Sequence, residues 1–416
     1  MTSAPNITFP APQVAAASRA TYAAFIGSGF AFASWASRIP QVRDGLELSS
    51  AGLGLLLLAI AVGSLIALPL AGLIVHRFGS RLTVTAMAVL LGIGLLTVAL
   101  GYLVGIVPVV IGLFLLGFAN GAWDVAMNVQ GASVEQHLGR SIMSRYHAGF
   151  SLGTVAGAGV GAVMVLASVS VTVHLLVVAI GTAVVVPVAV RGFLPDLSEN
   201  ADHAEKADKG SSDKGSVFRR WTEPRTLLIG VFVFAFAFAE GTGNDWIAVS
   251  LIDGYQASAA AGTVGFAVFL TAMTAGRWFG PNLLDRFGRV TVVRTLAVVA
   301  TGGLLLFIFS PSTPLAFVGI AVWGAGTSLG FPVGMSAAAD DPAAAAGRVS
   351  VVASIGYCAF LAGPPLIGFL GEHASVLKAL TVVAGLLAVA ALVAAALRPL
   401  PTAGAPDAAA VDDGNS

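Results

Sequence analysis

Charge is scarce in this chain of 416 residues, and cysteine is almost absent. Charged residues make up 10% of the sequence and hydrophobic residues 57%, a ratio that excludes a water-soluble protein of this size. The single Cys358 excludes an intramolecular disulfide framework and any cluster of cysteines around a metal. The formal net charge is zero, so the distribution of charge carries more information than its sum.

Motifs of enzymes are missing as well. The sequence has no Gly-x-x-x-x-Gly-Lys-Ser/Thr, so a P-loop does not couple it to ATP. It has no His-Glu-x-x-His and no credible Ser-His-Asp arrangement. Residues 1–18 lack a charged start followed by an apolar core, so we see no cleaved signal peptide. We therefore expect no enzyme activity, no cofactor and no metal.

What the sequence does have is long apolar runs of about 20 residues, the length that a helix needs to cross a bilayer. Lipid offers no partner for backbone N–H and C=O groups, so these runs are predicted as helices. That argument overrides the alternation of Phe232, Phe234, Phe236 and Phe238, which would suggest a strand in a soluble protein. The twelve predicted spans are 19–38, 51–75, 83–102, 108–131, 143–166, 171–190, 226–248, 262–284, 291–309, 314–337, 349–370 and 376–396.

Lysine and arginine fall mainly on one side of these spans. With the N-terminus inside, only Arg38, Arg43 and Lys378 lie outside, and Arg277 lies within a span. Short cytoplasmic loops retain positive charge, so both termini are predicted to be cytoplasmic. The basic loops orient the protein in the lipid bilayer and are not a nucleic-acid surface.

The spans divide into two sets of six. We predict a cytoplasmic tail over 1–18, a six-helix bundle over 19–190 and a second over 226–397. The segment 191–225 between them is rich in charge, Ser, Ala and Gly and is predicted to be a flexible linker, and 398–416 is predicted to be a disordered tail. We expect a monomer.

The two sets are copies of one unit. The segment Arg77-Phe78-Gly79 recurs as Arg286-Phe287-Gly288 within 285–289, and Gly139 recurs as Gly347 at almost the same offset. Because an even number of spans separates the copies, the halves run parallel, as in transporters whose halves are related by an axis along the membrane normal.

The repeated loop carries a family resemblance. A Gly-x-x-x-Asp-Arg-x-Gly-x-Arg pattern between spans 2 and 3, echoed between spans 8 and 9, resembles the major facilitator superfamily. In the first copy His76 replaces the Asp; the second copy keeps Asp285 but has Pro281 in place of the first Gly. Segments 124–131 and 143–153 resemble its bacterial YbjJ-type, fucose-permease-like branch. The resemblance implies a protein of the bacterial plasma membrane in which the residues of the two repeated loops take part in gating. They are Gly72, His76, Arg77, Gly79, Arg81, Asp285, Arg286, Gly288 and Arg289.

The fourth span carries a polar face. Asn120, Asp124 and Asn128 are four residues apart and therefore share one side of the helix. A carboxylate that faces lipid costs at least about 2.5 kcal/mol, so this side faces the bundle interior or water. Asp124 is predicted to exchange a proton and Asn120 and Asn128 to bind a polar substrate. The alternative is that Asp124 only pairs with a neighbouring helix.

The seventh span offers a second polar cluster. Glu240 and Asn244 share a face, and Glu240 is a candidate proton or substrate site. Asn244 and Asp245 are substrate candidates, whereas Trp246 is interpreted as an anchor at the membrane interface.

Three further residues are open to two readings. Trp35 could stack on a substrate ring or anchor the interface, and Arg38 could meet an anionic substrate or reach the headgroups. Arg277 is interpreted as a gating residue, with a carboxylate or helix end as alternative partners.

Glycines and histidines add two hypotheses. Gly149, Gly153 and Gly157 begin a four-residue ladder that is predicted to form the surface on which the halves move against each other. His76 is predicted to weaken the first gate or make it sensitive to pH, whereas His147 is read mainly as a residue at an aqueous interface.

These features predict an all-α secondary transporter of a small polar, sugar-like solute, coupled to protons and working by alternating access. Uptake is favoured because the Gly-Pro pair of the superfamily's drug–proton antiporters is absent. Efflux, or a sensor or scaffold that keeps the fold without transport, are the alternatives.

Overall fold

The computed structural model describes residues 9–139, 142–195, 220–341 and 344–400, and every regular element in them is helical. Most of the predicted linker and tail, 196–219 and 401–416, lies outside the described residues. The first half contains α1 (Ala11–Ala36), α2 (Ile39–Gly45), α3 (Ser50–Gly101), α4 (Ile106–Leu138), α5 (Met143–Leu166), α6 (Val171–Ala189) and η1 (Val190–Gly192). The second contains α9 (Pro224–Tyr255), α10 (Ala259–Phe287), α11 (Arg289–Phe309), α12 (Thr313–Thr327), α13 (Gly330–Ala338), α14 (Ala345–Ala374), α15 (Val376–Ala379), α16 (Thr381–Val393) and η2 (Ala394–Leu397).

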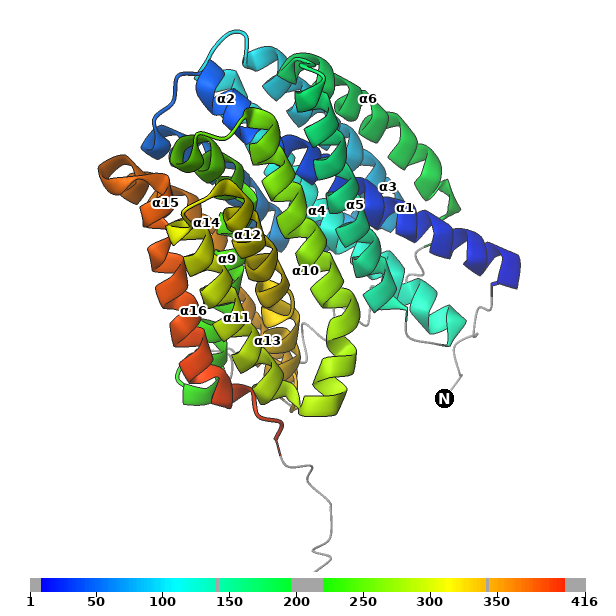
Figure 1. Cartoon of the computed structure of the whole chain (residues 1–416). Helices are drawn as coiled ribbons and strands as arrows, with labels where there is room; N and C mark the ends of the chain where they lie inside the picture. The colour runs from blue at the N-terminus through cyan, green and yellow to red at the C-terminus, as the bar shows by residue number, and fades with distance from the viewer. Residues whose placement is uncertain (1–8, 140–141, 196–219, 342–343, 401–416) are drawn as a thin grey trace, which may run out of the picture.

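The two halves lie side by side as helical bundles (Figure 1). We call the end of the bundle that holds α2 the α2 end, and the end where α1 begins and η2 finishes the termini end. Successive helices run in opposite directions between these two ends, because each apolar run is followed by a short polar turn.

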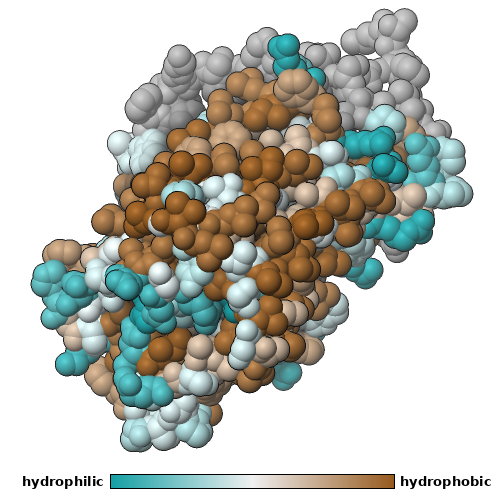
Figure 2. All heavy atoms as spheres, turned by 90° about the horizontal axis from the view of Figure 1, so that it is seen from above, coloured by the Kyte–Doolittle hydropathy of each residue, from teal (hydrophilic) through white to brown (hydrophobic). Residues whose placement is uncertain are grey.

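Many of the helices suit a membrane. Ten helical segments in the described residues are long and apolar enough to cross one, and the first of them, Ser50–Gly101, is 52 residues long. Apolar side chains cover most of the face shown in Figure 2, and hydrophilic side chains gather in patches toward its edges. Exposed Leu, Ile, Val and Phe side chains are expected where lipid is the solvent.

The internal repeat is visible in the backbone. Gly79 interrupts α3 with φ 76° and ψ 161°, and Gly288, between α10 and α11, has φ 76° and ψ 156°. A left-handed φ of this size suits glycine, which lacks the Cβ that would clash. In both copies an arginine lies over the following phenylalanine ring, Arg77 over Phe78 and Arg286 over Phe287. The sequence repeat is therefore a repeat of conformation.

The phenylalanine-rich stretch is helical, as predicted. It lies inside α9, where Phe232, Phe236 and Phe238 are buried. Phe232 and Phe236 are one turn apart and lie together on one side of the helix, with ring centroids 4.7 Å apart, whereas Phe238 lies on another side. Gly330 of α13 faces Phe236, and Gly363 of α14 faces Phe238.

The glycine ladder of α5 lies mainly against α1 of its own half, so the prediction is wrong for Gly153 and Gly157, although Gly161 also lies near Thr263 of α10. A Cβ on Gly153 would meet the Ile26 carbonyl oxygen at 2.2 Å, and one on Gly157 would meet the Phe30 carbonyl oxygen at 2.4 Å. Both partners belong to α1 of the same half. The ladder lets α1 and α5 approach closely, as small residues do in membrane bundles.

Contact between the halves is made by other surfaces. α3 packs against α14, and α5 packs against α10. Gly54 of α3 lies against the Pro364 carbonyl, and Gly368 of α14 lies against the Ser50 carbonyl. The glycines of α14 thus do contribute to the surface between the halves.

Candidate functional site

The polar face of α4 is joined to α1. Asn120 Oδ1 accepts a hydrogen bond of 3.0 Å from Ser28 Oγ of α1. Ser28 is fully buried and Asn120 is partly buried. The bond occupies the Asn120 oxygen and leaves its NH₂ group available as a donor.

Asp124 and Asn128 form the centre of a short hydrogen-bonded chain. Asn128 Nδ2 donates to the Asp124 backbone oxygen at 2.8 Å and to its carboxylate Oδ1 at 3.3 Å. Asn128 Oδ1 lies 3.1 Å from His147 Nε2 on α5. An amide oxygen can only accept, so this nitrogen of His147 carries a proton and donates. The chain runs from His147 through Asn128 to Asp124.

Asp124 has no cationic partner in the described part of the chain. Asn128 supplies its hydrogen bond, and the side chain is partly buried in the bundle. Its charge acts across the boundary between the halves on Tyr357 of α14. A membrane carboxylate without a fixed cation is free to bind and release a proton, because no ion pair has to break.

Glu240, by contrast, forms a two-point ion pair with Arg277. Arg277 Nη2 lies 2.8 Å and 2.9 Å from the two Glu240 carboxylate oxygens, and its Nε donates to the Ser328 backbone oxygen at 3.2 Å. Ser328 follows the last residue of α12, where the break before α13 leaves carbonyl groups free. A carboxylate and a helix end, the partners expected for Arg277 across the interface between the halves, are thus both present, but they lie within its own half.

Arg277 also reaches toward the other half. It belongs to α10, which packs against α5, the helix that carries His147. No local pattern in the sequence predicts this packing, since 130 positions separate the two residues.

The three clustered residues of α9, Asn244, Asp245 and Trp246, differ in their surroundings. Asn244 Oδ1 is buried and has no hydrogen-bond partner in the described residues, and Asp245 is partly buried with no bond or ion pair there. Both stay candidates for contact with a polar solute. Trp246 is completely buried, so its interpretation as an interface anchor is wrong.

Two residues near the end of α1 are also buried. Trp35 is 1% exposed, which rules out an anchor at the membrane surface. Arg38 is 2% exposed, and its Nε donates to His174 Nδ1 of α6 at 2.9 Å. Arg38 therefore does not extend along the surface to the headgroups, because its side chain turns into the bundle; its other reading, contact with an anionic substrate, stays a prediction.

The loop residues differ between the halves. Arg289 Nη1 lies 2.9 Å and 3.0 Å from the Asp340 carboxylate oxygens, whereas Arg81 of the first loop is exposed. His76 and Asp285 are both exposed. The second loop is therefore anchored through Arg289, an arginine that has Ser80 at the corresponding position of the first loop.

A charge network that the sequence analysis missed surrounds that anchor at the termini end. Glu223 accepts hydrogen bonds from Arg348, Arg220 and Thr226. Burial alone would raise the pKa of Glu223, but these three bonds outweigh it and lower the pKa to about 2. Glu223 precedes α9 and Arg348 lies in α14, so the pair holds two helices together.

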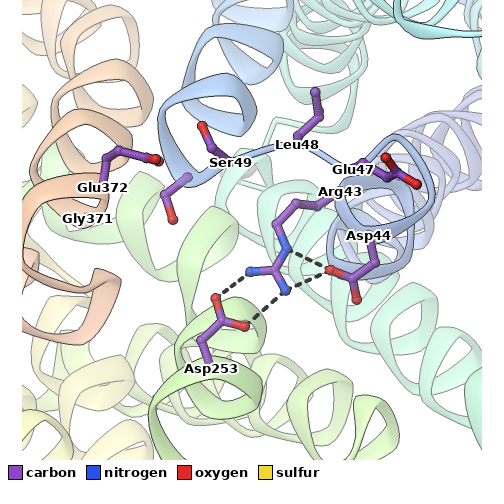
Figure 3. Close-up of a pocket in the computed structure, with 9 residues that line it drawn as sticks. Arg43, Asp44, Glu47, Leu48, Ser49, Asp253, Gly371 and Glu372 are labelled. Carbon is purple, nitrogen blue, oxygen red and sulfur yellow. Dashed lines mark hydrogen bonds and ion pairs between the residues drawn. The ribbon is translucent and has the colours of Figure 1, made fainter.

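The α2 end carries a contact between the halves that the sequence analysis also missed (Figure 3). Arg43 of α2 forms a two-point ion pair with Asp253 of α9 and also bonds Asp44, beside it in α2. Burial alone would lower the pKa of Arg43, but the bonds to Asp253 and Asp44 raise it above its ordinary value. Charged residues are rare at this end, and that scarcity is the signal that could have singled out Arg43.

Two weaker bonds support this contact. Thr263 Oγ1 of α10 donates to the Ser37 backbone oxygen at 3.4 Å, and Ala51 N of α3 donates to Glu372 of α14 at 3.3 Å. Arg43, Asp253 and Glu372 also line a polar pocket that is open at the surface. The halves are therefore fastened together at the α2 end.

Metal chemistry finds no support. Within 9–139, 142–195, 220–341 and 344–400, no group of three or more His, Cys, Asp or Glu side chains is placed to hold an ion.

Comparison with known proteins places this geometry in context. A family model described as Major Facilitator Superfamily matches residues 20–358 and 241–415. An uncharacterized transporter, y4wD of Sinorhizobium fredii, is 32% identical over 384 residues, covering 91% of this chain and 98% of that protein.

Solved structures agree in fold. The nucleoside transporter NupG has a TM-score of 0.71 at 15% identity, covering 91% of this chain and 98% of that chain. A D-xylose-proton symporter has a TM-score of 0.69 at 14% identity, covering 92% and 97% of the two chains.

Proposed function

Because the chain belongs to the Major Facilitator Superfamily, we propose that it is a proton-coupled secondary transporter that takes up a small polar solute across the bacterial plasma membrane. Membrane transport itself follows from the family and from the transporter relative. The direction of transport, the proton and the class of solute are our proposals, each argued from the residues below.

The proposed topology has twelve crossings and cytoplasmic termini. At about 1.5 Å per residue, the 52 residues of α3 extend for roughly 78 Å, enough for two crossings that meet at Gly79. α1 adds one crossing with its 26 residues, and its polar residues are mostly turned into the bundle. The positive charge of the loops puts the termini end in the cytoplasm.

With that orientation, the structure corresponds to an inward-facing state. Arg43 and Asp253 join the halves at the α2 end, which is then the outer end. Alternating access would require this contact to break while the termini end closes.

The observation that carries the proton coupling is the environment of Asp124. It is a membrane carboxylate at the boundary between the halves, held by an amide and by no cation in the described residues. Glu240 is less suited to proton exchange, because Arg277 stabilises its charged form through two hydrogen bonds. We therefore assign coupling to Asp124 and a structural role to Glu240.

The solute is proposed to be rich in hydroxyl groups. Asn120 offers an amide NH₂ group, and Asn244 offers an unpaired amide oxygen. Such donors and acceptors suit neutral hydroxyls, and the named fold neighbours handle nucleosides and D-xylose. Since Arg277 is neutralised by Glu240, no free cation among these candidate residues favours an anion.

Transport in proteoliposomes tests the proposal. Purified protein is reconstituted, a pH gradient is imposed, and uptake of sugars, polyols and nucleosides is measured together with proton movement. We expect one class of solute to accumulate with protons. Asp124→Asn should abolish accumulation while leaving exchange of solute, and Glu47→Gln, an exposed control outside the candidate sites, should leave both intact.

Three outcomes would overturn it in different ways. Full accumulation by Asp124→Asn would remove the coupling role of that residue. Solute export driven by protons would replace uptake with efflux. No flux of any solute in either direction would favour a sensor or scaffold.

A further inference from the structure

An apolar groove lies on the outside of the first half, between α1, α5 and α6. It has a volume of about 550 Å³ and is lined mainly by aliphatic side chains, including Ile26, Val177 and Val185, which are exposed. All its lining residues belong to the first half. Since α5 meets the second half through α10, this groove faces away from the proposed solute site and toward lipid.

The imidazole ring of one residue, His174, lies at the end of the groove that is nearest the α2 end. His174 lies in the first turn of α6, lines the groove and is 2% exposed. Its Nδ1 accepts a hydrogen bond from Arg38 Nε, a group that can only donate. The ring proton therefore sits on Nε2, on the side of the ring away from that bond.

That proton has no acceptor in the described residues. His174 Nε2 is buried and makes no hydrogen bond, although it is a donor. A buried donor without an acceptor costs about 1–3 kcal/mol, so the site is incomplete without an oxygen atom beside it.

Arg38 gives the same end of the groove a positive charge. Its guanidinium is buried, has no carboxylate partner in the described residues, and leaves Nη2 without a bond. Buried arginines are normally paired, because an isolated charge in an apolar setting is unfavourable. The Arg38–His174 pair therefore calls for an anion rather than for a neutral acceptor.

We propose that the groove binds one anionic phospholipid from the leaflet at the α2 end. An acyl chain lies along Ile26, Val177 and Val185, and a phosphate oxygen accepts the hydrogen bond from His174 Nε2. The His174 level, one turn from the end of the helix, matches the depth at which headgroups meet the hydrocarbon core. Basic pockets between membrane helices are known binding places for anionic headgroups.

The lipid would also support the proposed transport site from outside. α1 contributes Ile26 to the groove and, two residues later, Ser28 to the bond with Asn120. A lipid that holds α1 against α6 therefore stabilises the helix that positions Asn120. The lipid site does not depend on proton coupling, so either proposal can fail alone.

Native mass spectrometry of the detergent-purified full chain tests the proposal. The protein is incubated with phosphatidylglycerol or with phosphatidylethanolamine, and bound lipid is counted. We expect one phosphatidylglycerol per chain, bound roughly tenfold more tightly than phosphatidylethanolamine, since a charge-assisted hydrogen bond is at stake.

Three variants and one control locate the site. Gly181→Phe fills the groove, and a Cβ at Gly181 meets nothing within 4 Å, so the fold should tolerate it. It should abolish binding of the lipid, and His174→Leu should weaken it roughly tenfold. Arg38→Gln should remove the preference for the anionic lipid. Gly302→Phe, at an equally open position in α11, should bind as the wild type does.

Two results would overturn the proposal. One is equal binding of phosphatidylglycerol by the wild type and Gly181→Phe. The other is a wild-type protein that binds both lipids equally or neither. Because Gly181→Phe leaves Arg38 and His174 in place, these results do not depend on whether the polar variants fold.

Discussion

At the scale of single residues, the two membrane carboxylates have different surroundings and therefore different roles. Within the described residues Asp124 is held by Asn128, while both carboxylate oxygens of Glu240 accept hydrogen bonds from Arg277 Nη2. A charge held by a fixed opposite charge is expensive to change, whereas one held by an amide is not. The two carboxylates therefore differ through their partners and not through residue type: Asp124 is the candidate for proton exchange, and Glu240 is assigned a structural role.

Removing the Glu240 charge should destabilise the second half. Glu240→Gln leaves Arg277, whose side chain is 28% exposed, without its counter-ion. Breaking such a pair on one side costs about 3–5 kcal/mol when it is buried, and this pair is partly exposed, so we expect about 1–3 kcal/mol. The melting temperature of the purified protein would report the loss.

The double variant is the control for this prediction. Glu240→Gln with Arg277→Gln removes the stranded charge and should recover part of the melting temperature. A single variant as stable as the wild type would show that the ion pair contributes nothing.

At the scale of helices, packing depends on where two backbones come closest. α1 and α5 touch through Gly153 and Gly157, and α3 and α14 touch through Gly54 and Gly368. The first pair fixes the inside of one half, and the second pair joins the halves. Glycines therefore bring helices together both within one half and between the halves. Only the helix that a given glycine faces distinguishes the two cases.

A side chain at Gly153 should force α1 and α5 apart. Its Cβ would lie 2.2 Å from the Ile26 carbonyl oxygen, so Gly153→Leu is expected to cost at least about 1–3 kcal/mol by overpacking. The fraction of folded protein after extraction and its melting temperature would measure the effect. Gly159→Leu on the same helix, where a Cβ meets nothing within 4 Å, should behave as the wild type does.

Acid should loosen the contact between α9 and α14 at the termini end. The pKa of Glu223 is lowered to about 2 from an ordinary value of 4.5, so its bonds to Arg348 and Arg220 contribute fully above pH 4.5. Their contribution is lost as the pH falls from 4.5 through 2. Hydrogen exchange at the start of α9 should be slower at pH 6 than at pH 2, after correction for intrinsic rates.

Glu223→Gln supplies the comparison. This variant should already exchange faster at pH 6 and should change less on acidification. Equal protection of the wild type at both pH values would contradict the linkage.

How far the sequence predicts the molecule depends on the range of the interaction. The helical phenylalanine run, the repeated loop and the polar face of α4 rest on spacings of a few residues, and the structure has all three. The bonds of Arg38 to His174 and of Arg43 to Asp253 join residues 136 and 210 positions apart. No local pattern encodes such partners, which is why the sequence predicted neither bond and did not show which helix the glycine ladder of α5 faces.

At the scale of the whole molecule, two bundles meet along α3–α14 and α5–α10 and are fastened at the α2 end. The fastening residues belong to different halves, so any opening at that end must separate Arg43 from Asp253. This contact is therefore a determinant of which state the protein occupies, in addition to its contribution to stability.

Loss of the ion pair between Arg43 and Asp253 should shift the conformational equilibrium toward states that are open at the α2 end. Asp253→Asn removes one partner of Arg43 while keeping its size, and the expected result is a larger population of wide separations. Spin labels at Glu47→Cys and Gln256→Cys, in a Cys358→Ser background, would measure the distance between the halves. Asp44→Asn removes a bond within α2 and should leave the distances as in the wild type. Unchanged distances in Asp253→Asn would contradict the prediction.

The position of Asp44 has a kinetic consequence. Arg43 bonds Asp44 at 2.7 Å within α2 as well as Asp253 across the boundary, so it keeps one counter-ion when the halves part. If a buried cation lost every counter-ion during opening, the activation barrier would rise by several kcal/mol. Because Asp44 moves together with Arg43, the guanidinium keeps a counter-ion during the transition, and the barrier to opening and closing of the α2 end stays lower than it would be for an unpaired arginine.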